Sequence, residues 1–534
     1  MYRIIACNKD TYITDKIIDS SRSLDSNIGQ AGTLDLYKLY NETYFFGSDE
    51  VYEKTRILTG FDFSPLQELT SSVLNINDPS FKCFLSLKNI YSGLPVPSNF
   101  TISINPLAKN FDEGRGFDVI KYQDKDSCNW VTSSFSSGIT LWEVSGANKS
   151  GSVGESNIDY YSFGVINGIT SSLEKTFVFT RGDEDLLVDI TSVVSATLAN
   201  ILPDFGFRLT LTQSQDLDQY TYFVKRFASR HVRNPFDRPT IIVKYNDFFI
   251  DNQLDLYSDT QNTIATYNNN FGINENFVSA SQEITGSNCL TLELYASRSL
   301  TVWSSSFSQT HSQSIDHLVV STVYYSASFS ASQIQINGKY LSGAYYANVL
   351  FNSNSSGWLT YINSTNWNGS GKITNIDFSS VWKSIDGTLV YASGSGFTVK
   401  KNQSKSVNVF ERNYVLNVTN LKEIYFKNEK ARLRVFIQDY NLDMKYYKIP
   451  SDLVSAIYRK MYWRLINVNT KEVVIPFGNQ DDSTRLSSDG NGMYFDMYMQ
   501  DLPTEHFYEF EFLINEGGKD FYIQNQGFKF KVID

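Results

Sequence analysis

The chain has 534 residues, a formal net charge of −11, 41% hydrophobic residues and 19% charged residues. Its length exceeds what one hydrophobic core usually holds, so we expect roughly three domains. The acidic balance argues against a nucleic-acid surface, because neutralising phosphates needs clustered Lys and Arg. No run of residues approaches the ~20 apolar residues of a membrane-spanning helix. We therefore expect neither nucleic acid nor membrane among the partners.

The composition favours β-structure. The chain contains 34 Tyr and 38 Phe, and much of the remainder is Ser, Thr, Asn and Gly. Tyr, Phe, Thr and Val suit strands, whereas Asn, Gly and Ser suit the turns between them. We predict an all-β protein of three consecutive β-sandwich domains, of jelly-roll or immunoglobulin-like type, with one or two short helices.

Residues 1–247 form the first predicted domain. Alternating apolar and polar residues predict its strands at 34–40, 81–87, 100–104, 175–180, 206–212 and 239–245. A helix is expected over 188–201, where apolar residues recur at helical spacing. Asp189 or Thr191 can cap this helix, and Pro203 follows its end.

Two further domains are expected beyond a linker. The segment 248–285 is polar and rich in Asn, which is typical of a connection between domains. Strand patterns over 286–407 predict a domain of immunoglobulin-like size. Residues 408–534 predict a C-terminal β-sandwich with one helical turn at 451–457, because Ser451 can cap it after Pro450.

No pattern in the sequence predicts a catalytic, cofactor or metal site. The four Cys lack the CxxC spacing of metal ligands, and no two of the four His have the spacing of a ligand pair. The sequence also lacks the GxSxG motif of hydrolases. We expect a protein without enzymatic activity, cofactor or metal.

A basic segment at 223–238 contains the first group of candidate binding residues, Arg226, Arg230 and Arg233. Three interpretations are open. These side chains can pair with nearby carboxylates as part of the structure, contact an anionic ligand such as a phosphate, or form a subunit interface.

Aromatic residues in a polar loop form the second candidate group. Trp358, Tyr361 and Trp367 stand in a stretch rich in Ser, Asn and Gly. Such rings can stack on the face of a sugar or anchor a protein partner, and they can equally form the small core of a long loop.

The first 247 residues contain, in chain order, DTYI at 10–13, Asn27-Ile28-Gly29, TRILTGFDFSPL at 55–66, LVDITSVV at 187–194 and GFRLTLT at 206–212. These motifs resemble those of the DNRLRE-type β-sandwich, which is related to a carbohydrate-binding module family. The ending FVKRFASRHVRNPFDRPTIIVKYND, at 223–247, resembles the version found in structural proteins of contractile-tailed phages. The C-terminal segments 418–436, 474–478, 482–497 and 527–532 are similar to the same phage proteins.

This resemblance implies a structural protein of a phage virion and brings no catalytic residues. We expect it on the exterior of the neck, tail or baseplate, as a collar, whisker or fibre-attachment protein that docks onto other virion proteins. Several copies or a homo-oligomer are expected. Such a protein is made in the host cytoplasm and released by lysis, which agrees with an N-terminus that does not resemble a secretion signal.

Two other functions stay open. The first alternative is a receptor-binding or adhesin module that holds host surface polysaccharide. The second is a glycan-degrading tail enzyme, because paired carboxylates are brought together only by the fold.

Overall fold

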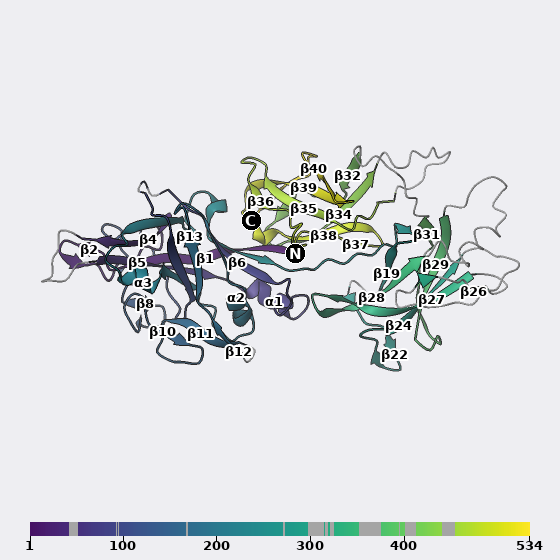
Figure 1. Cartoon of the computed structure of the whole chain (residues 1–534), viewed down its shortest axis with the longest axis horizontal. Helices are drawn as coiled ribbons and strands as arrows, with labels where there is room; N and C mark the ends of the chain where they lie inside the picture. The colour runs from purple at the N-terminus through teal and green to yellow at the C-terminus, as the bar shows by residue number, and fades with distance from the viewer. Residues whose placement is uncertain are drawn as a thin grey trace. The chain divides into compact units, whose positions relative to one another are not determined.

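The computed structural model describes residues 1–41, 52–91, 93, 95–166, 169–270, 273–296, 314–315, 319–320, 325–351, 375–394, 396–400, 413–439 and 454–534. The chain divides into two compact units. The N-terminal unit comprises Tyr2–Tyr245 with Gln500–Pro503, and the C-terminal unit comprises Met1, Asn246–Met499 and Thr504–Asp534. Strands dominate the described part of both units, which confirms the predicted all-β class (Figure 1).

A ten-stranded sheet forms most of the N-terminal unit, in the order β13-β7-β15-β5-β1-β17-β6-β14 with β4 and β16 attached through β5. The strands are β1 (Tyr2–Thr14), β4 (Thr33–Tyr40), β5 (Tyr52–Phe61), β6 (Lys82–Leu87), β7 (Phe100–Pro106), β13 (Lys175–Phe179), β14 (Leu186–Asp189), β15 (Phe207–Leu211), β16 (Phe223–Ala228) and β17 (Thr240–Lys244).

The long strand β1 joins the two halves of this sheet. Its first residues pair with β17, and the residues from Cys7 onward pair with β5. The register shifts between Cys7 and Lys9, and a bulge of this kind bends a strand and increases its twist. The strand thereby passes from one half of the sheet to the other just before Asp10.

Aromatic side chains form part of the buried core of the N-terminal unit. The rings of Phe100 and Phe179 stack with centroids 4.6 Å apart, and the Phe223 ring lies 4.5 Å from that of Phe100. All three side chains are buried, so their apolar area contributes to folding through the hydrophobic effect.

The predicted helix over 188–201 is present as α2 (Thr191–Leu198), and Asp189 Oδ1 accepts a hydrogen bond from the Thr191 amide at 2.8 Å. Two further short helices were not predicted, α1 (Ser64–Thr70) and α3 (Gln213–Leu217). The segment 55–66 therefore leaves its strand at Phe61. The Asp62 side chain accepts from the Ser64 amide at 2.9 Å, and a Pro stands at the helix start.

The C-terminal unit contains a second ten-stranded sheet, in the order β18-β31-β29-β24-β27-β28-β19, and two smaller sheets, β32-β34-β38-β37 and β33-β41-β39-β35-β36. The main strands of the large sheet are β18 (Leu256–Tyr257), β19 (Gln261–Tyr267), β24 (Leu290–Ala296), β27 (Tyr325–Ile336), β28 (Lys339–Phe351), β29 (Asn375–Lys383) and β31 (Phe397–Lys400). Those of the smaller sheets include β32 (Tyr414–Val418), β33 (Ile424–Phe426), β34 (Lys430–Asp439), β35 (Met461–Asn467), β36 (Val473–Ile475), β37 (Ser487–Asp489), β38 (Gly492–Tyr498), β39 (His506–Glu516) and β41 (Lys529–Ile533).

The segment 248–285 differs from the expected linker, because it contributes β18 and β19 to the large sheet. In β19 the side chains of Asn262, Ile264 and Ala265 are buried. Since one of these buried residues is polar, the sequence of β19 lacks the alternation of apolar and polar residues that usually indicates a strand. The predicted boundary at 407 lies outside the described residues.

The predicted helical turn at 451–457 is corrected for its described part. Residues 454–457 are not helical, and 451–453 lie outside the described residues. The Ala456 amide donates to the Ile437 carbonyl at 2.8 Å, and the Ser455 hydroxyl accepts from the Ile437 amide at 3.0 Å. The segment therefore lies along β34 because its polar groups bond to that strand instead of to a helical turn.

A buried carboxyl group stands beside β19. Asp251 is 1% exposed, and its Oδ1 accepts from the Gln253 amide at 2.9 Å. Its Oδ2 has no hydrogen-bond partner among the residues that the structure describes. Burial raises the pKa of Asp251 to about 7.

We predict that Asp251→Asn weakens the pH dependence of stability. The folded chain keeps Asp251 protonated up to about pH 7, whereas the unfolded carboxyl ionises near its ordinary pKa of about 4. The native free energy of unfolding therefore falls through this group as the pH rises from about 4 to 7, by roughly 2–4 kcal/mol. Urea unfolding at pH 4.5 and 7.5 measures the difference, with the exposed Asp520→Asn as control. An unchanged pH dependence in Asp251→Asn would contradict the assignment.

Candidate functional site

The buried side chain of Asn27 fixes a loop of the N-terminal unit that follows β7. Its Nδ2 donates to the carbonyls of Glu113 at 2.7 Å and Cys128 at 2.9 Å. Its Oδ1 accepts from the amides of Gly29 at 3.0 Å and Gly116 at 3.2 Å. One side chain thus holds three stretches of backbone, and we call this set of contacts the Asn27 clamp.

Glycines allow the backbone to approach within the clamp. A Cβ atom at Gly29 would stand 1.9 Å from the Glu113 carbonyl oxygen, and one at Gly116 would stand 1.8 Å from that of Asn27. Gly114 has a φ of +76°, a conformation that favours glycine. Since backbone atoms cannot yield to a side chain here, the path of the loop through 113–116 requires these glycines.

The clamp places Glu113 next to three residues from distant parts of the chain, Asp10, Arg230 and His231. The Glu113 carboxylate accepts from Arg230 Nε and, at 2.6 Å, from Arg230 Nη2. Glu113 Oε1 also accepts from the Asp10 amide at 3.0 Å and lies 3.3 Å from His231 Nε2. Asp10 Oδ2 accepts from the Arg230 amide at 2.6 Å. We call these four residues the Asp10 cluster.

The two carboxyl groups of the Asp10 cluster differ in how fully they are hydrogen-bonded. The hydrogen bond to Glu113 raises the pKa of Arg230, which stays positively charged. Asp10 is 1% exposed, and its Oδ1 has no hydrogen-bond partner within the described part of the chain. Burial raises the pKa of Asp10 to about 7. The cluster therefore contains one carboxyl group with an unused oxygen.

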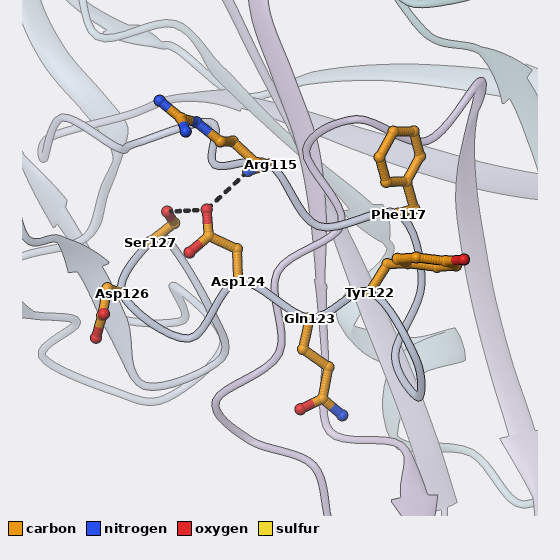
Figure 2. A pocket seen from close by; sticks show the side chains of 7 residues that line it. All are labelled: Arg115, Phe117, Tyr122, Gln123, Asp124, Asp126 and Ser127. Carbon is orange, nitrogen blue, oxygen red and sulfur yellow. Dashed lines mark hydrogen bonds between the residues drawn. The ribbon is translucent and has the colours of Figure 1, made fainter.

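The same loop forms a hollow on the surface of the N-terminal unit (Figure 2). Its volume is about 420 Å³, and it is lined by Arg115, Phe117, Tyr122, Gln123, Asp124, Asp126 and Ser127. The rings of Phe117 and Tyr122 meet edge to face with centroids 5.9 Å apart, and the two residues are 56% and 63% exposed. Large rings with this exposure are available to a ligand.

Short-range hydrogen bonds hold the aromatic side of the hollow. The Phe117 amide donates to the Tyr122 carbonyl at 2.7 Å. Asp118 Oδ1 accepts from the amides of Ile120 at 2.7 Å and Lys121 at 2.5 Å, and these bonds hold the pKa of Asp118 below its usual value. The two rings are thus carried on a turn that its own backbone closes.

On the polar side, Asp124 Oδ2 accepts from the Arg115 amide at 2.8 Å and from the Ser127 hydroxyl at 3.0 Å (Figure 2). Within the described residues, no side-chain hydrogen bond or ion pair engages the Arg115 guanidinium or the Asp126 carboxylate. The hollow therefore combines two exposed rings with a donor and an acceptor that are free to meet a ligand.

The basic segment is bonded within the N-terminal unit. Arg226 forms two hydrogen bonds to Asp35, at 2.7 and 2.6 Å, and Arg230 pairs with Glu113 as described above. These contacts match the structural interpretation of the segment. Arg233 is exposed, and the interface and anion-binding interpretations stay predictions.

Sequence reasoning did not find Asp10, Glu113, Phe117 or Tyr122. The sequence feature that could have indicated this loop is the EGRG run at 113–116, where two glycines flank an Arg just after an acidic residue. The predicted Trp358, Tyr361 and Trp367 lie outside the described residues.

Comparisons with known proteins supply no family. A scan against protein families finds no match, and neither does a search of curated proteins. Within the described residues, every helix is too short or too polar to cross a bilayer.

We predict that Asn27→Ala destabilises the N-terminal unit by about 3 kcal/mol, because four backbone groups lose their partners and their burial leaves them unsatisfied. Urea unfolding followed by tryptophan fluorescence measures the change, and the exposed Asn77→Ala serves as control. A loss below about 0.5 kcal/mol, the size of an ordinary surface substitution, would show that the clamp is not needed for stability.

Proposed function

We propose that this chain is a non-catalytic binding protein whose N-terminal unit binds a polysaccharide in the hollow. The observation that carries the proposal is that two exposed rings, Phe117 and Tyr122, line the same hollow as the charged residues Arg115 and Asp126 (Figure 2). The resemblance of this unit to carbohydrate-binding sandwiches supports the same conclusion.

The chemistry of a sugar matches this arrangement. A pyranose ring has an apolar face that packs against an aromatic ring, and hydroxyl groups at its edge that both donate and accept hydrogen bonds. Phe117 or Tyr122 would contact the face, while the Arg115 guanidinium would donate to hydroxyl groups and the Asp126 carboxylate would accept from them. The volume of about 420 Å³ lies in the range of small-ligand sites, and an open hollow suits a segment of a longer chain.

The wider setting that we propose is the exterior of a phage virion, at the neck, tail or baseplate. The motifs of the first 247 residues and of the C-terminal segments support this setting. In it, several copies of the chain would dock onto neighbouring virion proteins, and the hollow would contact host surface polysaccharide.

Glycan binding should depend on the two rings. We expect Tyr122→Ala and Phe117→Ala each to weaken binding of host polysaccharide by at least about tenfold, since stacked aromatic contacts dominate such interfaces. Ile120→Ala is a matched control, because Ile120 is 62% exposed in the same loop but does not line the hollow. Glycan-array screening followed by calorimetry measures the affinities.

Three results would contradict this proposal. The native chain could bind no glycan, or Ile120→Ala could weaken binding as much as the ring variants. Release of reducing sugar from host capsule would instead identify a glycan-degrading enzyme.

Docking onto other virion proteins is the second candidate function, and an exposed apolar pair favours it. Phe163 and Val165 lie on one face of β11 (Tyr160–Ile166), in a three-stranded sheet with β10 (Ser150–Ser152) and β12 (Ile169–Ser172). Both side chains are more than half exposed. Apolar residues at alternate strand positions form a small surface that a protein partner can cover.

Particles are therefore expected to contain this chain and to lose it when that surface is made polar. Replacing Phe163 and Val165 together by Ser should reduce its amount in purified particles by at least about tenfold. Val178→Ser, a similarly exposed position on β13, is the control. Mass spectrometry of purified particles gives the copy number, and absence of the native chain from particles would exclude the virion setting.

A further inference from the structure

We propose that Asp10, Glu113 and His231 form a binding site for a divalent transition-metal ion of the Zn²⁺ type. One ligand atom from each residue lies within 4.8 Å of the other two. An ion between three atoms at this spacing can reach all of them with small side-chain adjustments, because Zn–O and Zn–N bonds are about 2.0–2.2 Å long.

The unused oxygen of Asp10 is an independent observation that points to a ligand. Asp10 is 99% buried on β1, and its Oδ1 has no partner in the described part of the chain. An unsatisfied carboxylate oxygen at such depth costs free energy. A bound cation would satisfy this oxygen and compensate the buried charge.

The donor set selects the class of ion. Two carboxylates and one imidazole suit borderline transition metals, whereas Ca²⁺ and Mg²⁺ prefer oxygen ligands alone. Three protein ligands would leave one position of a tetrahedral ion for water.

Arg230 shows that the cluster already accepts a positive charge at Glu113. An ion would compete with this guanidinium. The Arg230 side chain is 31% exposed, so it has a path into water when the ion binds. Glu113 and His231 are also partly exposed, which gives an ion access to the cluster.

The three ligands come from β1, from the clamped loop and from the turn after β16. An ion would therefore cross-link segments that lie 103 and 118 residues apart in the chain. The three ligands lie in the Asp10 cluster and not in the hollow, so the ion would bind whether or not the hollow binds a glycan.

The test uses the full chain after treatment with a chelator. Calorimetric titration with Zn²⁺ at pH 7.5 should reveal a site, and Co²⁺ should give the visible absorption of a four- or five-coordinate ion. We expect His231→Gln and Asp10→Asn each to weaken Zn²⁺ binding by at least roughly tenfold, since even outer-shell partners of a metal contribute that much. Arg230→Gln should strengthen binding severalfold by removing the competing cation.

His506→Gln is the matched control, because His506 lies on β39 in the C-terminal unit, and it should leave Zn²⁺ binding unchanged. Circular dichroism of each metal-free variant establishes that it folds. If Asp10→Asn does not fold, the test is made with His231→Gln and Arg230→Gln, since both side chains are only partly buried. Absence of Zn²⁺ binding, or binding that His231→Gln and Arg230→Gln leave unchanged, would overturn the proposal. Loss of glycan binding in the ring variants would not affect this result.

Discussion

The four hydrogen bonds of the Asn27 side chain are the constraint on which both candidate sites depend. They hold the backbone at Glu113 and Gly116 against the segment 27–29. Glycines make this approach possible, because a Cβ would collide with backbone atoms. A loop of this length would otherwise pay a large conformational entropy to keep one shape. The clamp supplies the shape before any ligand binds, which lowers the entropic cost of recognition.

The loop that the Asn27 clamp holds contributes side chains both to the largely buried Asp10 cluster and to the hollow at the surface. Glu113 faces inward to the Asp10 cluster, where charges are paired at short distance. Four residues later, Phe117 begins the exposed side of the hollow. In the basic segment at 223–238, as in the Asp10 cluster, positively charged side chains bond to groups of the same unit. Lys225 is fully buried, donates to the Gly182 and Glu184 carbonyls, and has its pKa lowered to about 8 by burial. Lys225 and Arg230 therefore hold the loops that contain Glu184 and Glu113 in place through hydrogen bonds.

Local patterns predicted the fold class, six of the ten strands of the large N-terminal sheet and helix α2, because period and capping are encoded over a few residues. The Asp10 cluster could not be predicted, because Asp10, Glu113 and the adjacent Arg230 and His231 lie on three segments more than 100 residues apart that meet only through the topology. The role of Phe117 depends on a turn closed by Asp118, which a strand pattern does not reveal. The strand β19 escaped prediction because Asn262 is one of its buried residues.

Hydrogen–deuterium exchange of the N-terminal unit tests most directly whether the loop is held in one shape before ligand binding. We predict that the amides of Gly29 and Gly116 are protected in the native chain, and that Asn27→Ala removes their protection while β5 and β7 stay protected. Rapid exchange of both amides in the native chain would show that the clamp does not persist in solution and would contradict the account.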